Sequence, residues 1–148
     1  METIVIIPPR AGVAGYRYFK ITWTSNWGAG LVGMSVLWIC DGSGAKYNTE
    51  SMVHTYSGSQ INGTPQEMSN TNEGDYWQLQ PDYPSWWKVD MGSANAKECE
   101  ILKIRSFYED ATRCFKDFTL HGSNNDSNWD LLFTGQTILD TYLQTFQL

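Results

Sequence analysis

Acid–base chemistry is the first possibility that the sequence raises, because it contains two histidines and a pair of adjacent carboxylates. His54 and His121 lie far apart in the chain, and neither has a nucleophile beside it in a recognisable catalytic motif. Glu109 and Asp110 are neighbours in a polar stretch, whereas a glycoside hydrolase needs two carboxylates that face each other across a cleft. The sequence has no glycine-rich phosphate loop and no zinc-ligand spacing. We therefore expect a protein without catalytic activity.

The cysteine pattern predicts neither a disulfide framework nor a metal site. The chain has three cysteines, Cys40, Cys99 and Cys114, and an odd number without regular spacing fits neither arrangement. Cys40 and Cys99 lie in apolar stretches that have the pattern of strands. We expect these two residues to be buried thiols.

Aromatic side chains are abundant for a chain of this size. Of the 148 residues, 14% are aromatic, including seven tryptophans, and only 18% are charged. This length suits one domain with a substantial core. Large aromatic residues are mostly buried in cores, and those that the core does not use are available for a binding surface.

The charge and the apolar pattern exclude several classes of partner. The net charge is −6 and the pI is about 4.7, whereas a general nucleic-acid binder needs a basic surface. The sequence has no apolar run of the roughly 18 residues that a membrane-spanning helix requires. Residues 1–10 have no basic segment and only a short apolar run, so no signal peptide is expected.

The predicted elements are strands, and the clearest of them form a hairpin in the last third of the chain. Phe118 and Leu120 face one side of a strand, and Trp129, Leu131 and Phe133 resume the alternation after a polar turn at 122–128. This pattern predicts a hairpin with an aromatic inner face. Because a lone hairpin cannot bury such a face, other strands must cover it.

Further strands are predicted on both sides of this hairpin. They cover 16–24, 34–40, 76–80, 86–91, 99–107 and 142–147, with one or two short strands inside the long loops of 45–75. No segment of ten residues has helical periodicity. We therefore expect an all-β sandwich of about eight antiparallel strands at 16–148, preceded by an arm and linker at 1–15.

Two motifs resemble those of a known family. The stretches 86–93, Trp-Trp-Lys-Val-Asp-Met-Gly-Ser, and 116–129, Lys-Asp-Phe-Thr-Leu-His-Gly-Ser-Asn-Asn-Asp-Ser-Asn-Trp, are similar to the core signature of discoidin, or coagulation factor type C, domains. That family includes the family 32 carbohydrate-binding modules. Met91 replaces the family's leucine, and Ser127 stands where a glycine is frequent. The resemblance covers 16–146 and implies a jelly-roll sandwich of the galactose-binding-like type.

The order of the strands departs from the family. Residues 16–21, followed by a glycine-rich loop and an apolar strand, look like the pair that usually closes the domain, but here they open the chain. This order is similar to that of modules in bacteriophage tail and other virion proteins. It predicts a place on a virion or another extracellular surface.

The resemblance implies a ligand site at one end of the sandwich, where the loops 25–33, 52–61, 81–85 and 107–113 would converge. In or beside these loops stand Trp27, His54, Tyr56, Tyr83, Arg105, Tyr108 and Arg113. Such residues suit a sugar, because an aromatic face stacks on the apolar face of a pyranose and polar groups bind its hydroxyls. In the alternative interpretation, Trp27 and Tyr83 only cover the end of the sandwich.

Many members of the family hold a structural calcium ion near these loops. The matching residues here are Asn70, Glu73 and Asp75, which would supply oxygen ligands. However, Asn70 stands where the family usually has aspartate, and the strand at 34–40 lacks the acidic ligand that such relatives supply.

Two functions remain open from the sequence. The first is a lectin-like module that recognises glycans or glycoproteins, as in adhesion to a surface. The second is a structural protein of a virion, such as a tail or capsid appendage, that contacts other virion proteins or itself. In the second case the apolar arm at 2–9 would dock on a neighbour by adding a strand.

Overall fold

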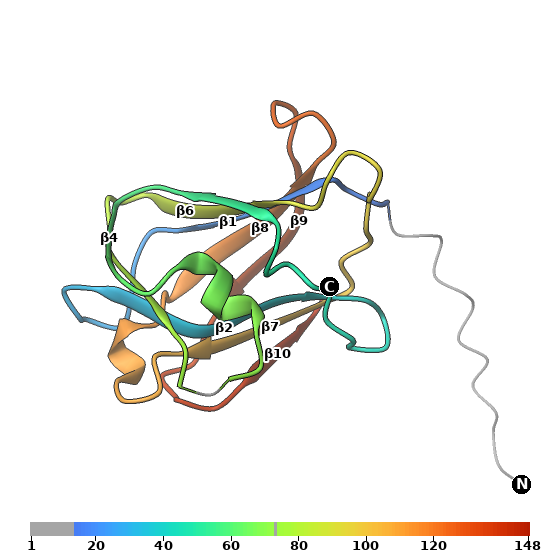
Figure 1. Cartoon of the computed structure of the whole chain (residues 1–148). Helices are drawn as coiled ribbons and strands as arrows, with labels where there is room; N and C mark the ends of the chain where they lie inside the picture. The colour runs from blue at the N-terminus through green and yellow to red at the C-terminus, as the bar shows by residue number, and fades with distance from the viewer. Residues whose placement is uncertain (1–13, 73) are drawn as a thin grey trace, which may run out of the picture.

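The computed structural model describes residues 14–72 and 74–148, which form two antiparallel β-sheets packed face to face (Figure 1). The first sheet has the order β3 (Val53–Tyr56), β6 (Ser85–Asp90), β1 (Tyr18–Trp23), β8 (Asp117–Ser123) and β9 (Asp130–Gln136). The second sheet has the order β10 (Gln144–Gln147), β7 (Ile101–Ser106), β2 (Val32–Cys40), β5 (Trp77–Gln80) and β4 (Ser59–Asn62). The predicted all-β sandwich is confirmed, and β3 and β4 occupy the stretch where one or two short strands were expected.

Two short 3-10 helices, η1 (Pro65–Ser69) and η2 (Ala111–Arg113), lie in the connections. None of the helices in the described part of the chain is long and apolar enough to cross a membrane. The N-terminal arm at 2–9 lies outside the described residues, so its docking stays a prediction.

Period-two alternation places the core between the sheets. In β1 the side chains of Phe19, Ile21 and Trp23 are fully buried, while the residues between them face outwards. Trp87 and Val89 of β6 are also fully buried, as their alternation predicts. Strand β2, the central strand of the second sheet, is buried along nearly its whole length.

The expected buried thiols are confirmed. Cys40 and Cys99 are free cysteines with buried side chains, and the structure adds Cys114, for which the sequence analysis made no such prediction. Burial disfavours the thiolate and raises the pKa of Cys99 and that of Cys114 to about 12. These thiols are therefore protonated and unreactive at neutral pH.

The predicted alternation of the hairpin is wrong in β9. The register shifts between Leu120, which pairs with Phe133, and His121, which pairs with Leu131, so Leu132 is an extra residue in a β-bulge. Leu131 consequently faces outwards beside His121 and is 59% exposed, whereas Phe133 packs against the core.

The connections between β1 and β2, β3 and β4, β5 and β6, and β7 and β8 leave the sandwich at one end, on the left of Figure 1. The pairing fixes this arrangement, since Trp23 at the end of β1 lies opposite Ser85 at the start of β6 and near the start of β8. We call it the Trp23 end. The predicted loops share this end, although most of 52–61 is strand.

Candidate functional site

Trp27 lies at the Trp23 end but is held against the body of the protein. Its indole Nε1 donates a hydrogen bond to Thr137 Oγ1 at 3.0 Å, and the Lys116 ammonium lies 4.7 Å from its ring centroid. The half-buried ring also packs against the core. These contacts match the alternative interpretation, in which Trp27 covers the end of the sandwich.

His54 and Tyr56 face the interior from β3. The indole Nε1 of Trp87 donates to His54 Nδ1 at 3.0 Å, so the imidazole proton is on Nε2, which donates to the carbonyl of Thr49 at 2.7 Å. Tyr56 packs edge-on against Trp77, with ring centroids 5.0 Å apart. Both aromatic rings are thus part of the packing between the sheets.

The burial of His54 makes stability depend on pH. Burial disfavours the charged imidazole and lowers the pKa of His54 from its ordinary value of 6.5. As pH falls below 6.5, the unfolded chain takes up protons that the folded chain does not, so we expect the free energy of unfolding to decrease. Urea unfolding at a series of pH values from about 7.5 to about 5 measures this slope.

His54→Gln should flatten this pH dependence more than His121→Gln does. The pKa of His121 is also lowered, first by burial and then by Lys20, but its ring is less buried than that of His54. If the free energy of unfolding depends on pH with the same slope in the wild type and in His54→Gln, the pH dependence does not come from His54.

The other predicted residues are spread over two places. Tyr83 and Tyr108 are exposed at the Trp23 end. Arg113 lies there too, 4.8 Å from the ring centroid of Phe107, and its Nε is 3.2 Å from a carboxylate oxygen of Asp110. Tyr108 packs against the same Phe107, so the structure brings Tyr108 and Arg113 together.

Arg105 is one residue before the end of β7 and so lies close to the Trp23 end, but its side chain does not join the loops there. It projects from β7 on the outer face of the second sheet, where its Nε donates to the carbonyl of Thr141 at 2.9 Å. There it lines a depression of about 170 Å³ together with Trp38 and Leu143. The seven predicted residues therefore do not form one site.

Two of the three predicted calcium ligands lie together, and Glu73 is outside the described residues. The side-chain amides of Asn70 and Asn72 both donate to Asp75 Oδ2, and the amide oxygen of Asn70 accepts from the backbone N–H of Asn72. The described part of the chain contains no group of three His, Cys, Asp or Glu residues suited to a metal. The calcium ion stays a prediction.

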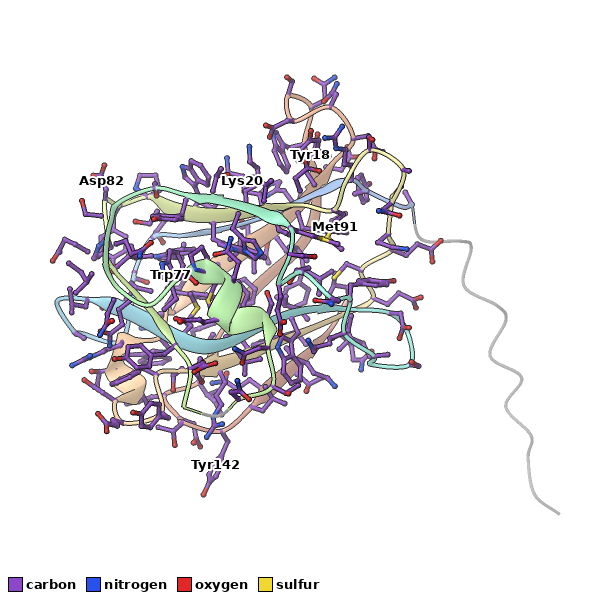
Figure 2. The ribbon with its side chains drawn as sticks, in the orientation of Figure 1. Tyr18, Lys20, Trp77, Asp82, Met91 and Tyr142 are labelled. Atoms are coloured by element: carbon purple, nitrogen blue, oxygen red, sulfur yellow. The ribbon has the colours of Figure 1, made fainter. Side chains whose placement is uncertain are left out.

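The outer face of the first sheet carries a concentration of aromatic and charged side chains that the sequence analysis did not single out. Tyr18 and Lys20 project outwards from β1, and Trp86 and Lys88 project outwards from the neighbouring β6. Figure 2 shows Tyr18 and Lys20 on the outer side of this sheet, with Trp77 between the layers. Trp129, just before β9, reaches the same face from the other side of β1.

These five residues, Tyr18, Lys20, Trp86, Lys88 and Trp129, form what we call the aromatic platform. The Lys20 ammonium lies 5.2 Å from the ring centroid of Trp86 and 5.4 Å from that of Trp129. The Lys88 ammonium lies 5.8 Å from the ring centroid of Tyr18 and 5.9 Å from that of Trp86. The three rings are half-exposed, and each lies within cation–π distance of a lysine ammonium.

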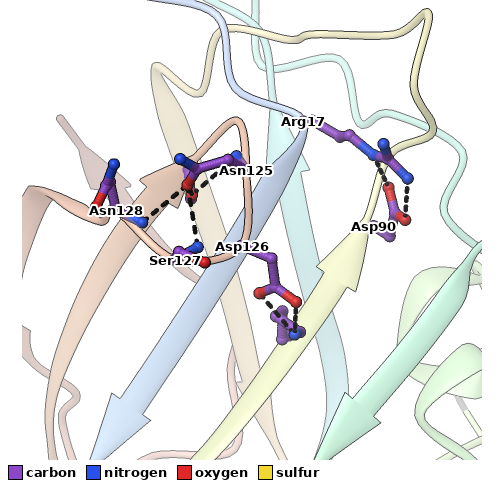
Figure 3. Close-up of polar contacts among 8 residues, drawn as sticks. Arg17, Asp90, Asn125, Asp126, Ser127 and Asn128 are labelled. Carbon is purple, nitrogen blue, oxygen red and sulfur yellow. Dashed lines mark hydrogen bonds and ion pairs between the residues drawn. The ribbon is translucent and has the colours of Figure 1, made fainter.

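Two ion pairs border the aromatic platform (Figure 3). Arg17 donates twice to the carboxylate of Asp90, with both N–O distances at 2.8 Å. The Lys88 ammonium lies 2.6 and 2.7 Å from the two carboxylate oxygens of Asp126. The Arg17 guanidinium holds the pKa of Asp90 below its ordinary value.

The turn that carries Asp126 is fixed by its own hydrogen bonds. Asn125 Oδ1 accepts from the backbone N–H of Ser127 at 3.0 Å and of Asn128 at 2.8 Å (Figure 3). Asp126 itself has a left-handed φ of 58°, which Asp tolerates better than most residues. The charged border is therefore positioned by a rigid turn.

Two shallow depressions adjoin the platform on the same face. One, of about 190 Å³, is lined by Tyr18, Lys88, Asp90 and Asp126 together with β3. The other, of about 180 Å³, is lined mainly by threonines of β1, β8 and β9. Together with the rings, they give this face room for an extended ligand.

A signal for this face was present in the sequence. If Phe19, Ile21 and Trp23 face inwards, then Tyr18 and Lys20 must face outwards. The same alternation in 86–91 turns Trp86 and Lys88 outwards, and an outward tryptophan is informative because this residue is usually buried.

Comparisons with protein-family models, with curated proteins and with solved structures find no match to this chain. The function is therefore inferred from the chain's own side chains.

Proposed function

We propose that this protein is a non-catalytic carbohydrate-binding module whose aromatic platform is the glycan-binding surface. The observation that carries the proposal is the presence of three half-exposed aromatic rings, Tyr18, Trp86 and Trp129, among lysines on one sheet face. Aromatic rings stack on the apolar C–H faces of pyranoses, and lysine and carboxylate groups hydrogen-bond to the hydroxyls.

The Trp23 end supports this function less well. Trp27 and His54 engage their polar atoms with the rest of the protein, and the Tyr56 hydroxyl donates to Gln60 Oε1 at 2.7 Å. Tyr83 and Tyr108 are the exposed aromatic residues that remain there among the predicted ones.

The resemblance to discoidin domains supports the same function from the sequence, although in that family the ligand meets the loops. The resemblance to bacteriophage tail modules makes a virion or another extracellular surface the proposed location. A calcium ion held by Asn70, Glu73 and Asp75 stays part of this proposal, with no role at the platform.

Affinity electrophoresis through gels that contain soluble polysaccharides tests the proposal. We expect retardation by at least one polysaccharide. Trp86→Ala and Trp129→Ala should each lower the affinity about ten-fold, because removing a central aromatic contact typically costs more than about 1 kcal/mol. Both side chains lie outside the core, so the variants should stay folded.

Tyr83→Ala and Tyr108→Ala are the matched controls, since they remove exposed aromatic rings at the Trp23 end. We expect their affinities to stay within about two-fold of the wild type. If these variants lose binding and the tryptophan variants retain it, the ligand meets the loops and the platform assignment is wrong.

A second candidate function is protein–protein contact within a virion. It is favoured by the connection between β9 and β10, where Ile138, Leu139, Tyr142 and Leu143 are 61%, 54%, 75% and 44% exposed. Tyr142 projects away from the body of the protein (Figure 2). An exposed apolar group of this kind often marks an interaction surface.

A further inference from the structure

We propose that the platform recognises a sugar residue with an anionic substituent, a carboxylate or a sulfate, and that Lys20 binds this group between Trp86 and Trp129. The inference rests on the proposed function and names the class of glycan. Its basis is the arrangement of charges in the middle of the first sheet.

Three basic side chains form one row across the outer face. Lys20 lies directly opposite Lys88 in the pairing of β1 with β6, and directly opposite His121 in the pairing of β1 with β8. Like charges at directly opposite positions of antiparallel strands destabilise a sheet. The two lysine charges that face each other across β1 and β6 therefore favour an anion beside Lys20.

The carboxylates around this row are already engaged. Asp126 neutralises Lys88, and Asp90 is bound by Arg17 in a bidentate pair. Asp130 accepts a hydrogen bond from the hydroxyl of Tyr16 at 2.9 Å.

Lys20 differs from Lys88 because it has no ion-pair partner among residues 14–72 and 74–148. Its contacts are the faces of Trp86 and Trp129. The pKa of His121 is lowered by burial and also by the charge of Lys20, so this imidazole does not supply a second positive charge at neutral pH.

The two indoles give this ammonium a defined position. Trp86 in β6 and Trp129 just before β9 approach Lys20 from opposite sides of β1, so a chain of sugars that crosses the sheet would meet a ring, the ammonium and a second ring in turn. A charge-assisted hydrogen bond from Lys20 to the anion would fix the register of the glycan. Stacking on the two rings would provide the part of the affinity that does not depend on the anionic group.

Matched pairs of polymers test the inference at physiological salt, which suppresses non-specific attraction. The first pair is polygalacturonate and the same polymer with its carboxylates reduced to hydroxymethyl groups. The second pair is dextran sulfate and dextran. We expect the wild type to bind one of the two acidic polymers at least about ten-fold more tightly than its neutral counterpart, and the pair that shows the difference identifies the anion as carboxylate or sulfate.

Lys20→Gln should remove this preference, so that the affinity for the acidic polymer falls about ten-fold, to that for its neutral counterpart. Lys97→Gln is the control for charge, because Lys97 also lies over an aromatic ring, that of Tyr47, with its ammonium 5.7 Å from the centroid. Lys97→Gln and the charge-preserving Lys20→Arg should both keep the preference. Thermal unfolding of all variants checks that their folds are intact.

The outcomes separate this inference from the proposed function. If Lys20→Gln and Lys97→Gln behave alike, or if acidic and neutral polymers bind equally in a manner that depends on Trp86, the anionic preference is wrong and the glycan platform stands. If no polymer of the panel binds, the anionic preference and the proposed glycan-binding function are both wrong.

Discussion

Replacement of Trp23 by alanine should lower the free energy of unfolding by about 3 to 5 kcal/mol, which is the usual cost of removing a large aromatic side chain from a core. Trp23 is fully buried and stacks on Phe115, with ring centroids 5.2 Å apart and an interplanar angle of 16°. Because a domain is stable by only about 5 to 15 kcal/mol, the variant should be close to unfolding. Urea denaturation followed by tryptophan fluorescence measures the change.

Trp27→Ala is the matched control for this prediction, because it removes the same side chain at the same end of the sandwich. Trp27 is only half-buried and donates one hydrogen bond, so its loss should cost about 1 to 2 kcal/mol.

Trp23→Phe should also cost less than Trp23→Ala. It keeps an aromatic ring and removes an indole N–H that has no hydrogen-bond partner among the described residues. Equal losses for Trp23→Ala and Trp27→Ala would contradict the placement of the core.

Replacement of Gly63 by alanine should cost at least about 3 kcal/mol, since it combines backbone strain with a steric clash. Gly63 has a φ of +65°, in the left-handed region, and a Cβ atom here would overlap the carbonyl oxygen of Tyr76 and the carboxylate of Glu67. That carboxylate accepts the backbone N–H of Thr64 at 2.8 Å just before η1. Met68 of η1 is fully buried, so displacement of η1 would also disturb the core.

Gly30→Ala tests whether any glycine substitution in a loop has this effect. A Cβ atom on Gly30 meets no atom within 4 Å, and its φ is not in the left-handed region. We expect a change within about 0.5 kcal/mol, as for most surface substitutions. A comparable loss of stability in both variants, measured by urea denaturation, would show that the conformation at Gly63 is not the cause.

The strands could be predicted from the sequence because each strand of a sandwich buries one face. Phe19, Ile21 and Trp23 are sufficient to identify β1 and its inner side, and Trp87 does the same for β6. The error in β9 has a physical reason as well. The bulge at Leu132 is determined by pairing with β8, and nothing in the local alternation indicates it.

The candidate site could be predicted only in part, because a residue's partners decide whether its polar atoms are available. His54 and Trp27 have the right chemistry for a sugar site, but their hydrogen bonds to Trp87 and Thr137 come from distant segments. The outward positions of Trp86 and Lys20 were implied by alternation, but their proximity was not.

The sequence by itself determines the all-β class, the inner faces of the main strands and the burial of Cys40 and Cys99, because these depend on local periodicity and on the burial of apolar side chains. The tertiary structure decides which strands are neighbours. Pairing of β1 with β6 and β8 places Lys20 between Trp86 and Trp129, residues that are far apart in the chain. Hydrogen bonds between distant strands create that surface, so it exists only after the chain has folded.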